Sequence, residues 1–125
     1  MWLRMSRKHH SNEAVIMKDR IGLYLKLNST FAMPIVSRKL ERLYNISNRV
    51  VREAVGLLRD EGLPIASGSL GFFYATTADQ LEPTIDNLKE RIAVISRRRA
   101  LLMQARNKMR EDANGQRLLF TNLEN

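Results

Sequence analysis

The sequence contains no cysteine, so neither disulfide bonds nor thiolate metal sites are open to this chain. Its only two histidines are neighbours, His9 and His10, and two adjacent imidazoles without further ligands make a poor metal site. The chain also lacks a glycine-rich phosphate loop and a paired-carboxylate metal pattern. We therefore expect no enzymatic activity, no metal and no cofactor.

Long apolar runs are absent as well. A helix needs about 20 consecutive apolar residues to cross a bilayer, and no stretch of the chain approaches this, so we expect no membrane contact. The opening segment, MWLRMSRKHH, carries charge but no apolar stretch behind it, unlike a secretory signal. These features predict a cytoplasmic protein.

Acidic residues are scarce relative to basic ones. The chain has 13 Asp and Glu against 21 Lys and Arg, a formal net charge of +8 and a pI near 10.4. Such an excess favours a polyanionic partner, of which nucleic acid is the commonest for a chain of this size. The 125 residues suffice for one small domain with an appended helix. Composition and periodicity predict a basic arm at 1–11, a folded domain at 12–76, a long helix at 77–112 and a polar tail at 113–125.

Helical signals begin directly after the basic arm. Apolar content and capping residues predict a first helix at about residues 12–27, with Ser11 or Asn12 as its N-cap. A second helical pattern follows Pro34, and Ser37 is expected to be its N-cap.

A third helix is predicted over residues 47–61. Asn45 tolerates a left-handed backbone, so it suits the sharp turn before this helix, and Ser47 fits its N-cap. Gly62 fits the position just past its end. Four apolar residues at helical spacing form the expected buried stripe: Val51, Ala54, Val55 and Leu58.

The segment after this helix reads as a β-hairpin. Residues 63–66 are short and apolar, SGSLG supplies turn residues, and residues 72–75 are rich in β-forming side chains. Helix, turn, helix and hairpin, in that order, are the parts of a winged helix. The sequence therefore predicts a mainly α (α+β) fold, a winged helix-turn-helix with a two-stranded wing and a long C-terminal helix.

One junction carries a resemblance to a known family. Residues 58–65, LRDEGLPI, resemble the LREEG-x-P-I pattern of winged helix-turn-helix domains of the biotin-repressor type, and Gly71-Phe72-Phe73 resembles the opening of their second wing strand. The resemblance covers residues 34–76, roughly a third of the chain, and nothing resembles the ligase domain of the biotin repressor.

The resemblance implies that helix 47–61 enters the major groove of double-stranded DNA. The residues that would then face bases are Ser47, Asn48, Arg49, Arg52 and Glu53. The residues that would hold phosphates are Ser37, Arg38, Lys39 and Arg42. The expected wing tip is Ser67, Gly68 and Ser69, small enough for the backbone to approach the sugar-phosphate edge.

The C-terminal helix is expected to begin with a capping box formed by Thr77 and Gln80. Apolar residues along it are spaced alternately four and three apart, which is a heptad seam: Leu81, Ile85, Leu88, Ile92 and Ile95. The same spacing continues through Arg99, Leu102, Arg106 and Met109. This stripe either packs back on the domain or forms a homodimer, and the length of the helix favours the dimer. The basic segment 97–110 offers a further surface for phosphates or for an acidic protein partner.

Two functions fit these features. The first is a sequence-specific, dimeric DNA-binding protein, such as a small bacterial or phage transcription regulator that sits on the nucleoid and reads an inverted repeat. The alternative is a winged-helix protein-interaction module that docks on a polymerase or replication component through its C-terminal helix.

Overall fold

The computed structural model describes residues 11–124, with side chains up to residue 117. Two compact units are present, the first ending at Ile85 and the second beginning at Asp86. The elements are α2 (Asn12–Asn28), α3 (Ser37–Tyr44), α4 (Asn48–Asp60), β1 (Ile65–Gly68), β2 (Gly71–Tyr74), the 3-10 turn η1 (Ala78–Leu81) and α5 (Glu82–Glu124). The protein is thus mainly helical with a two-stranded antiparallel sheet and a long C-terminal helix, an α+β fold.

Serine side chains start two of the helices as the sequence predicts. Ser11 Oγ accepts a hydrogen bond from the Ala14 amide at 3.1 Å, and Ser47 Oγ accepts one from the Val50 amide at 3.2 Å. The prediction for Ser37 is wrong. Val36 occupies the N-cap position of α3 without a side-chain cap, and Ser37 is the first helical residue.

Left-handed residues end α3 and α4. Asn45 has φ 51° and ψ 55°, as predicted for the turn, and the Ile46 amide donates to the Glu41 carbonyl at 3.0 Å. Gly62 has φ 88° and donates to the Arg59 carbonyl at 2.9 Å, as predicted for the residue past the end of α4. These two turns fix the angles at which the chain enters α4 and the hairpin.

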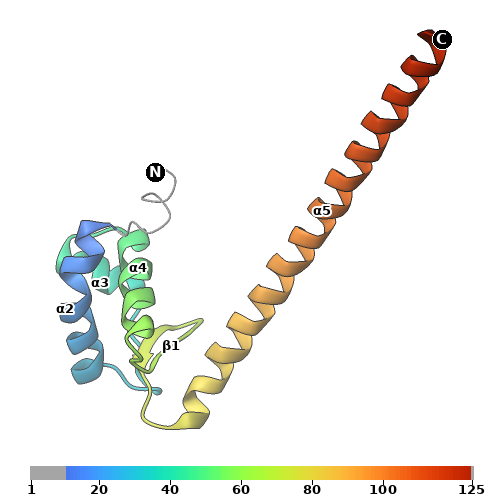
Figure 1. Ribbon diagram of the computed structural model, residues 1–125. Helices are drawn as coiled ribbons and strands as arrows, with labels where there is room; N and C mark the ends of the chain where they lie inside the picture. Colours follow the sequence, from blue (N-terminus) through green and yellow to red (C-terminus); the bar gives the residue numbers. More distant parts are fainter. Residues whose placement is uncertain (1–10, 125) are drawn as a thin grey trace. The chain divides into compact units, whose positions relative to one another are not determined.

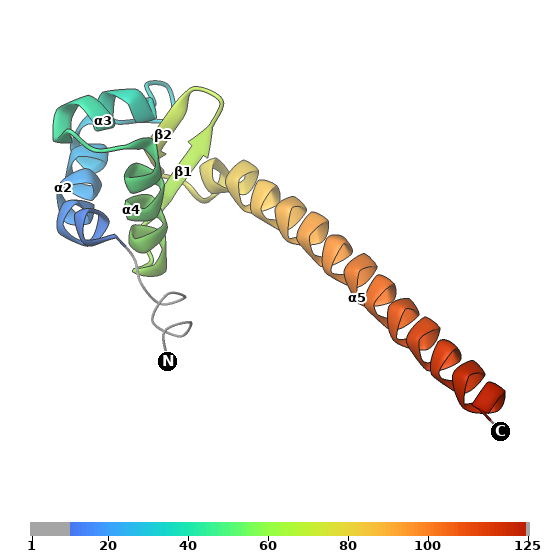
Figure 2. The same cartoon turned by 90° about the horizontal axis from the view of Figure 1, so that it is seen from above.

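The core of the first unit lies between the three helices and the hairpin. Helices α2 and α4 lie side by side (Figure 1), and α3 runs across them (Figure 2). The largest fully buried side chains are Ile21, Leu25, Leu40, Val51, Val55, Leu58 and Ile65. Burying each contributes about 1.5–3 kcal/mol. The predicted apolar stripe of α4 is therefore the side of the helix that packs into the core.

The hairpin pairs Ile65 with Tyr74 at its open end and Gly68 with Gly71 at its closed end, leaving a two-residue loop of Ser69 and Leu70. The segment before α3 joins this sheet through one further bridge. Ile35 and Phe72 exchange two backbone hydrogen bonds, each 2.8 Å. The chain before α3 is thereby tied to β2.

The unit boundary lies at residue 85, later than the predicted end of the domain at 76, because the start of α5 packs on the hairpin. Thr84 is 7% exposed, and its hydroxyl accepts from the Ser67 amide at 3.0 Å and donates to the Ser67 carbonyl at 3.2 Å. Leu81 packs against a small cluster of Ala66, Phe73 and Ala75.

The predicted capping box at Thr77 is wrong. Thr77 makes no side-chain cap, and Gln80 Oε1 instead accepts from the amide and hydroxyl of Thr76, at 2.9 and 3.3 Å. The predicted end of the C-terminal helix at residue 112 is also wrong. Helix α5 continues through 113–124, the segment expected to be a polar tail. The proposed arm, apart from Ser11, lies outside the described residues, as do His9 and His10.

Candidate nucleic-acid interface

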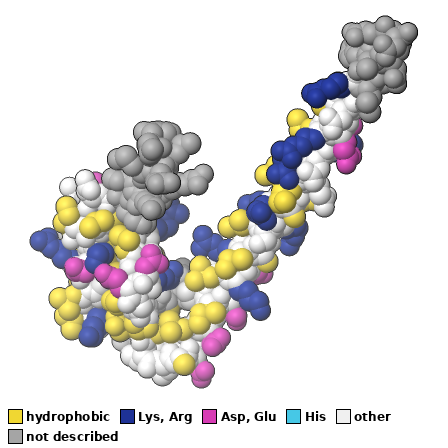
Figure 3. Space-filling model, viewed as in Figure 1, with side chains coloured by type: hydrophobic (Ala, Val, Ile, Leu, Met, Phe, Trp, Pro, Cys, Tyr) yellow, Lys and Arg dark blue, Asp and Glu magenta, His cyan; other side chains and the backbone are white. Residues whose placement is uncertain are grey.

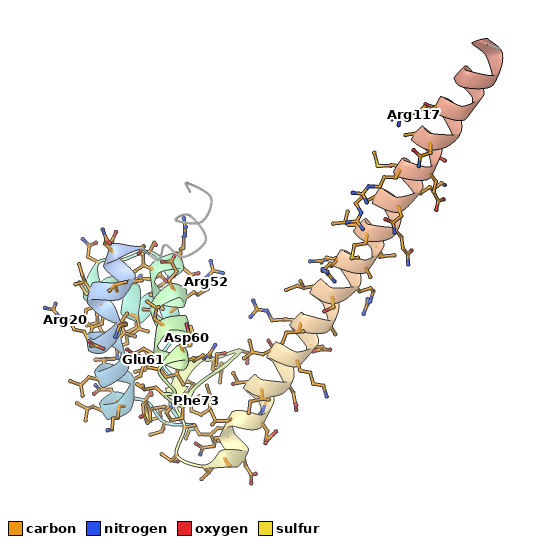
Figure 4. All side chains as sticks on the ribbon, in the orientation of Figure 1. Arg20, Arg52, Asp60, Glu61, Phe73 and Arg117 are labelled. Carbon is orange, nitrogen blue, oxygen red and sulfur yellow. The ribbon has the colours of Figure 1, made fainter. Side chains whose placement is uncertain are left out.

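The outer face of α4 gathers the polar side chains that the sequence singles out. Ser47, Asn48, Arg49 and Arg52 are exposed, while the opposite face of the same helix is buried. Figure 4 shows Arg52 projecting from α4 on the side away from α2. Arg52 makes no hydrogen bond or ion pair with any described residue. Its five donors are available to an external ligand.

Glu53 is turned toward the start of α2. One carboxylate oxygen accepts from the Ser11 amide at 3.1 Å, and the other accepts from Arg49 Nε at 3.0 Å. The Ser11 hydrogen bond, with a smaller contribution from Arg49, holds the pKa of Glu53 below its ordinary value of 4.5 although partial burial opposes this. Because both carboxylate oxygens accept hydrogen bonds, Glu53 holds the Arg49 side chain and the start of α2 in place. Among the predicted base-facing residues, Glu53 is the one that is half-buried, while the other four are exposed.

Asn48 belongs to a hydrogen-bond chain that joins the first residues of α3 and α4. Its Nδ2 donates to Ser37 Oγ at 2.8 Å, and Ser37 Oγ donates to Glu41 Oε2 at 3.1 Å. A residue predicted to face a base and a residue predicted to hold a phosphate are thus in direct contact. The sequence analysis did not include Glu41 in the site, although Glu41 lies four residues after Ser37 on one helix, a spacing at which side chains interact.

Three cations cover the exposed side of α3. Arg38, Lys39 and Arg42 are exposed and line a shallow hollow together with Val36 and Leu43. None of the three forms an ion pair within residues 11–117, so their charge is not neutralised by the domain itself. This face of α3 therefore presents net positive charge beside α4.

The hairpin tip differs from the predicted one. Ser67 is half-buried within β1, where its hydroxyl accepts from Arg59 Nη2 at 3.2 Å, so it lies below the tip. Arg59 Nε also donates to the Ile65 carbonyl at 2.8 Å, which pins β1 to α4. Gly68 and Ser69 are exposed as predicted, and Leu70, which the sequence reasoning missed, is 69% exposed in the loop.

The predicted seam divides between the two units. Leu81 is the last residue of η1 and is half-buried, with its side chain packed against the cluster of Ala66, Phe73 and Ala75. The other five are exposed on α5: Ile85, Leu88, Ile92, Ile95 and Leu102. Figure 3 shows apolar and basic side chains alternating along this helix. Ile85 is the last residue of the first unit and the other four belong to the second, and all five are uncovered in a single copy of the described chain.

Other kinds of site find no support in the described part of the chain. No group of three His, Cys, Asp or Glu side chains there is placed to hold a metal ion. Of the helices in that part, none combines the length and apolarity that crossing a membrane requires. Comparison of the chain with protein-family models, with curated proteins and with solved structures gave no match.

Proposed function

We propose that the first unit is a winged helix-turn-helix that binds double-stranded DNA in a sequence-specific way, with α4 in the major groove. The observation that carries this proposal is the exposed set Asn48, Arg49 and Arg52 on one helix, beside the unpaired cations of α3. The order of α2, the Ile35 bridge, α3, α4 and a hairpin supports it, because a winged helix has these parts in this order.

The side chains suit the two tasks of a DNA reader. Arg pairs with both major-groove acceptors of guanine, and Asn pairs with adenine, so Arg49, Arg52 and Asn48 supply sequence discrimination. Arg38, Lys39 and Arg42 bind phosphates and set the register of the domain on the duplex. Gly68 and Ser69 let the wing backbone approach the sugar-phosphate edge. The wing carries no cation, so α3 and α4 supply most of the affinity.

We further propose that α5 pairs with α5 of a second copy, in antiparallel orientation. A parallel pair in register would set Arg99 against Arg99 and Arg106 against Arg106 along the seam. It would also set the segment 97–110, with six cations and no acid, beside itself. With Ile92 opposite Leu102, an antiparallel pair instead sets Arg99 opposite Ile95 and Arg106 opposite Leu88, so that no seam arginine faces another arginine.

The same pairing brings apolar groups together. If Ile92 meets Leu102 of the second copy, Ile85 meets Met109, and all four positions are exposed side chains in one copy. The two Ile85 residues then lie about 36 Å apart along the helix axis, from a rise of about 1.5 Å per residue.

Alanine substitutions test the DNA interface. Arg49→Ala and Arg52→Ala are each expected to cost about 1–3 kcal/mol at the preferred site and to relax specificity there, whereas Arg38→Ala should weaken binding to every sequence. Arg20→Ala is the matched control, because Arg20 projects from the far side of α2 (Figure 4). Affinities measured by fluorescence anisotropy that stay unchanged in all three test variants would contradict the proposal.

The role that follows is occupation of a promoter or another inverted-repeat site on the nucleoid, in the cytoplasm. The exposed apolar groups of α5 also fit the alternative, in which this helix docks on a polymerase or replication component. The two differ in a measurable way. A chain that is monomeric in solution and binds no duplex would favour the protein-docking function.

A further inference from the structure

The direction of each hydrogen bond at the start of α3 and α4 is fixed by the groups involved. Glu41 is a carboxylate, which only accepts, so the hydroxyl of Ser37 donates its single hydrogen to Glu41 Oε2 at 3.1 Å. The Ser37 oxygen is then left as an acceptor toward Asn48. For this reason the Asn48 side chain turns its NH2 group to Ser37, at 2.8 Å.

This orientation determines what Asn48 offers to a ligand. An amide nitrogen carries two hydrogens, and one is used by Ser37. The second hydrogen and the Oδ1 oxygen have no partner among the described residues, and the side chain is exposed. The free face of Asn48 is therefore one donor and one acceptor, which lie side by side when Ser37 takes the hydrogen that points away from Oδ1.

A donor beside an acceptor matches one base in the major groove. Adenine presents the acceptor N7 and the donor N6-amino group, whereas guanine presents two acceptors, N7 and O6. With the amide reversed, Oδ1 would face Ser37 and two donors would point outward, a pattern suited to guanine. In contact with DNA, the carboxylate of Glu41 would thus select between these two purines through Ser37.

We propose that Ser37 and Glu41 are positioning residues that make Asn48 a reader of adenine. The inference rests on the proposed DNA-binding function and names the base that one residue of the site recognises. Ser37 is also the first residue of α3, whose neighbours Arg38 and Lys39 are proposed to hold phosphates. The base position read by Asn48 is consequently fixed relative to the phosphates held by α3.

The test is selection of binding sequences from a random duplex pool, followed by sequencing, for the full chain and its variants. Asn48→Ala should abolish the preference for adenine at one position of each half-site, which assigns that position to Asn48. Ser37→Ala should reduce the same preference by about 2- to 10-fold, the worth of one hydrogen bond. Glu41→Ala frees the hydroxyl to point either way and should shift the position from adenine toward either purine.

Two further variants keep the experiment decisive. Ser37→Thr retains the hydroxyl and should restore the preference, whereas a merely structural defect would not be rescued in this selective way. Ser96→Ala, at an exposed serine of α5, is the matched control and should select the same sequences as the parent. Thermal unfolding of each variant verifies that it folds.

The outcomes distinguish a failure of this inference from a failure of the proposed DNA-binding function. If the parent chain enriches no sequence, the DNA-binding proposal itself fails. If it enriches a site but the position lost in Asn48→Ala is not adenine, the inference is wrong. An adenine preference that persists unchanged in Ser37→Ala and Glu41→Ala would equally overturn it.

Discussion

A single glycine determines how closely the hairpin approaches the chain before α3. Gly71 has φ 124°, and a Cβ atom there would lie 2.4 Å from the Ile35 carbonyl oxygen. Gly71→Ala should therefore destabilise the protein by more than about 2 kcal/mol, because both the backbone conformation and the contact are unfavourable. Urea unfolding at neutral pH measures this loss.

The hairpin supplies its own control for that experiment. Gly68 is the cross-strand partner of Gly71, and a Cβ there meets nothing within 4 Å. Gly68→Ala should leave the unfolding midpoint nearly unchanged. Equal losses in both variants would show that the hairpin disfavours any side chain at its closed end, and that the approach to Ile35 has no special importance.

Glu53 gives the domain an acid-sensitive contact. Its pKa is lowered by the Ser11 amide and by Arg49, so its ionised form stabilises the folded state above the ordinary value of 4.5. This stability is lost as the pH falls through the lowered pKa. We expect Glu53→Gln to be less stable than the parent at pH 7, with the difference shrinking below pH 4.5.

Urea unfolding of the parent and Glu53→Gln from pH 7 down to pH 3 checks this expectation. Glu13→Gln is a suitable control, since Glu13 is an exposed carboxylate that makes no hydrogen bond with the described residues. A difference between the parent and Glu53→Gln that stays constant over the whole range would argue against an ionised Glu53 as the cause.

Residues whose task is local were predictable from the sequence. Ser47 and Asn45 were placed correctly because capping and left-handed turns depend on side-chain chemistry within a few residues. Glu53 and Ser67 were not, because their partners come from other elements. Ser37 was not either, because Val36 takes the N-cap position and the Ser37 hydroxyl bonds Glu41 and Asn48 instead. The exposed side chains of α4 followed from its periodicity, whereas the hydrogen bonds that orient Asn48 and Arg49 required the fold.

At the scale of elements, Thr84 couples the first turn of α5 to β1. Its buried hydroxyl bonds both the amide and the carbonyl of Ser67. Thr84→Val keeps the shape but leaves these two groups without a partner, so we expect a loss of about 1–3 kcal/mol. Amide hydrogen exchange at Ser67 should accelerate in this variant. Thr84→Ser retains the hydroxyl and should be far milder, and equal losses in the two variants would rule out the hydrogen bonds as the cause.

The sequence predicted the type and order of the elements in the first unit but misjudged the ends of α5. Thr77 and Gln80 have capping-box spacing, yet a 3-10 turn precedes α5, and its last residue, Leu81, packs against the cluster that contains Phe73. The polar residues after 112 suggested fraying, but they are acceptable helix formers and contain no proline to stop the helix. Periodicity identified the helix but located neither of its ends.

At the scale of the whole molecule, the orientation of the proposed dimer can be read from engineered disulfides, because the chain has no cysteine of its own. Antiparallel pairing predicts that Ile92→Cys and Leu102→Cys chains cross-link when mixed, while neither cross-links efficiently by itself. Parallel pairing predicts efficient self-cross-linking of each variant. Non-reducing gel electrophoresis separates the two arrangements.

Charged substitutions test whether the dimer exists at all. Asp in place of both Leu88 and Ile92 should yield a monomer in sedimentation, since two carboxylates per chain would have to be buried in the seam. Replacing Asn87 and Ala93, two exposed residues outside the seam, by Asp adds the same two negative charges and serves as the control. A parent chain that already sediments as a monomer would contradict the pairing and leave α5 available for another protein.

If α5 pairs with a second copy as proposed, the folding of this exposed helix depends on the amount of protein present. A helix without tertiary contacts depends on intrinsic propensity alone and is marginal in water, whereas one that folds on association is stabilised by mass action. We therefore expect helical ellipticity at 222 nm to rise with protein concentration while the melting temperature of the first unit stays constant. In a cell, the level of expression would then determine the fraction of chains in which α5 is folded.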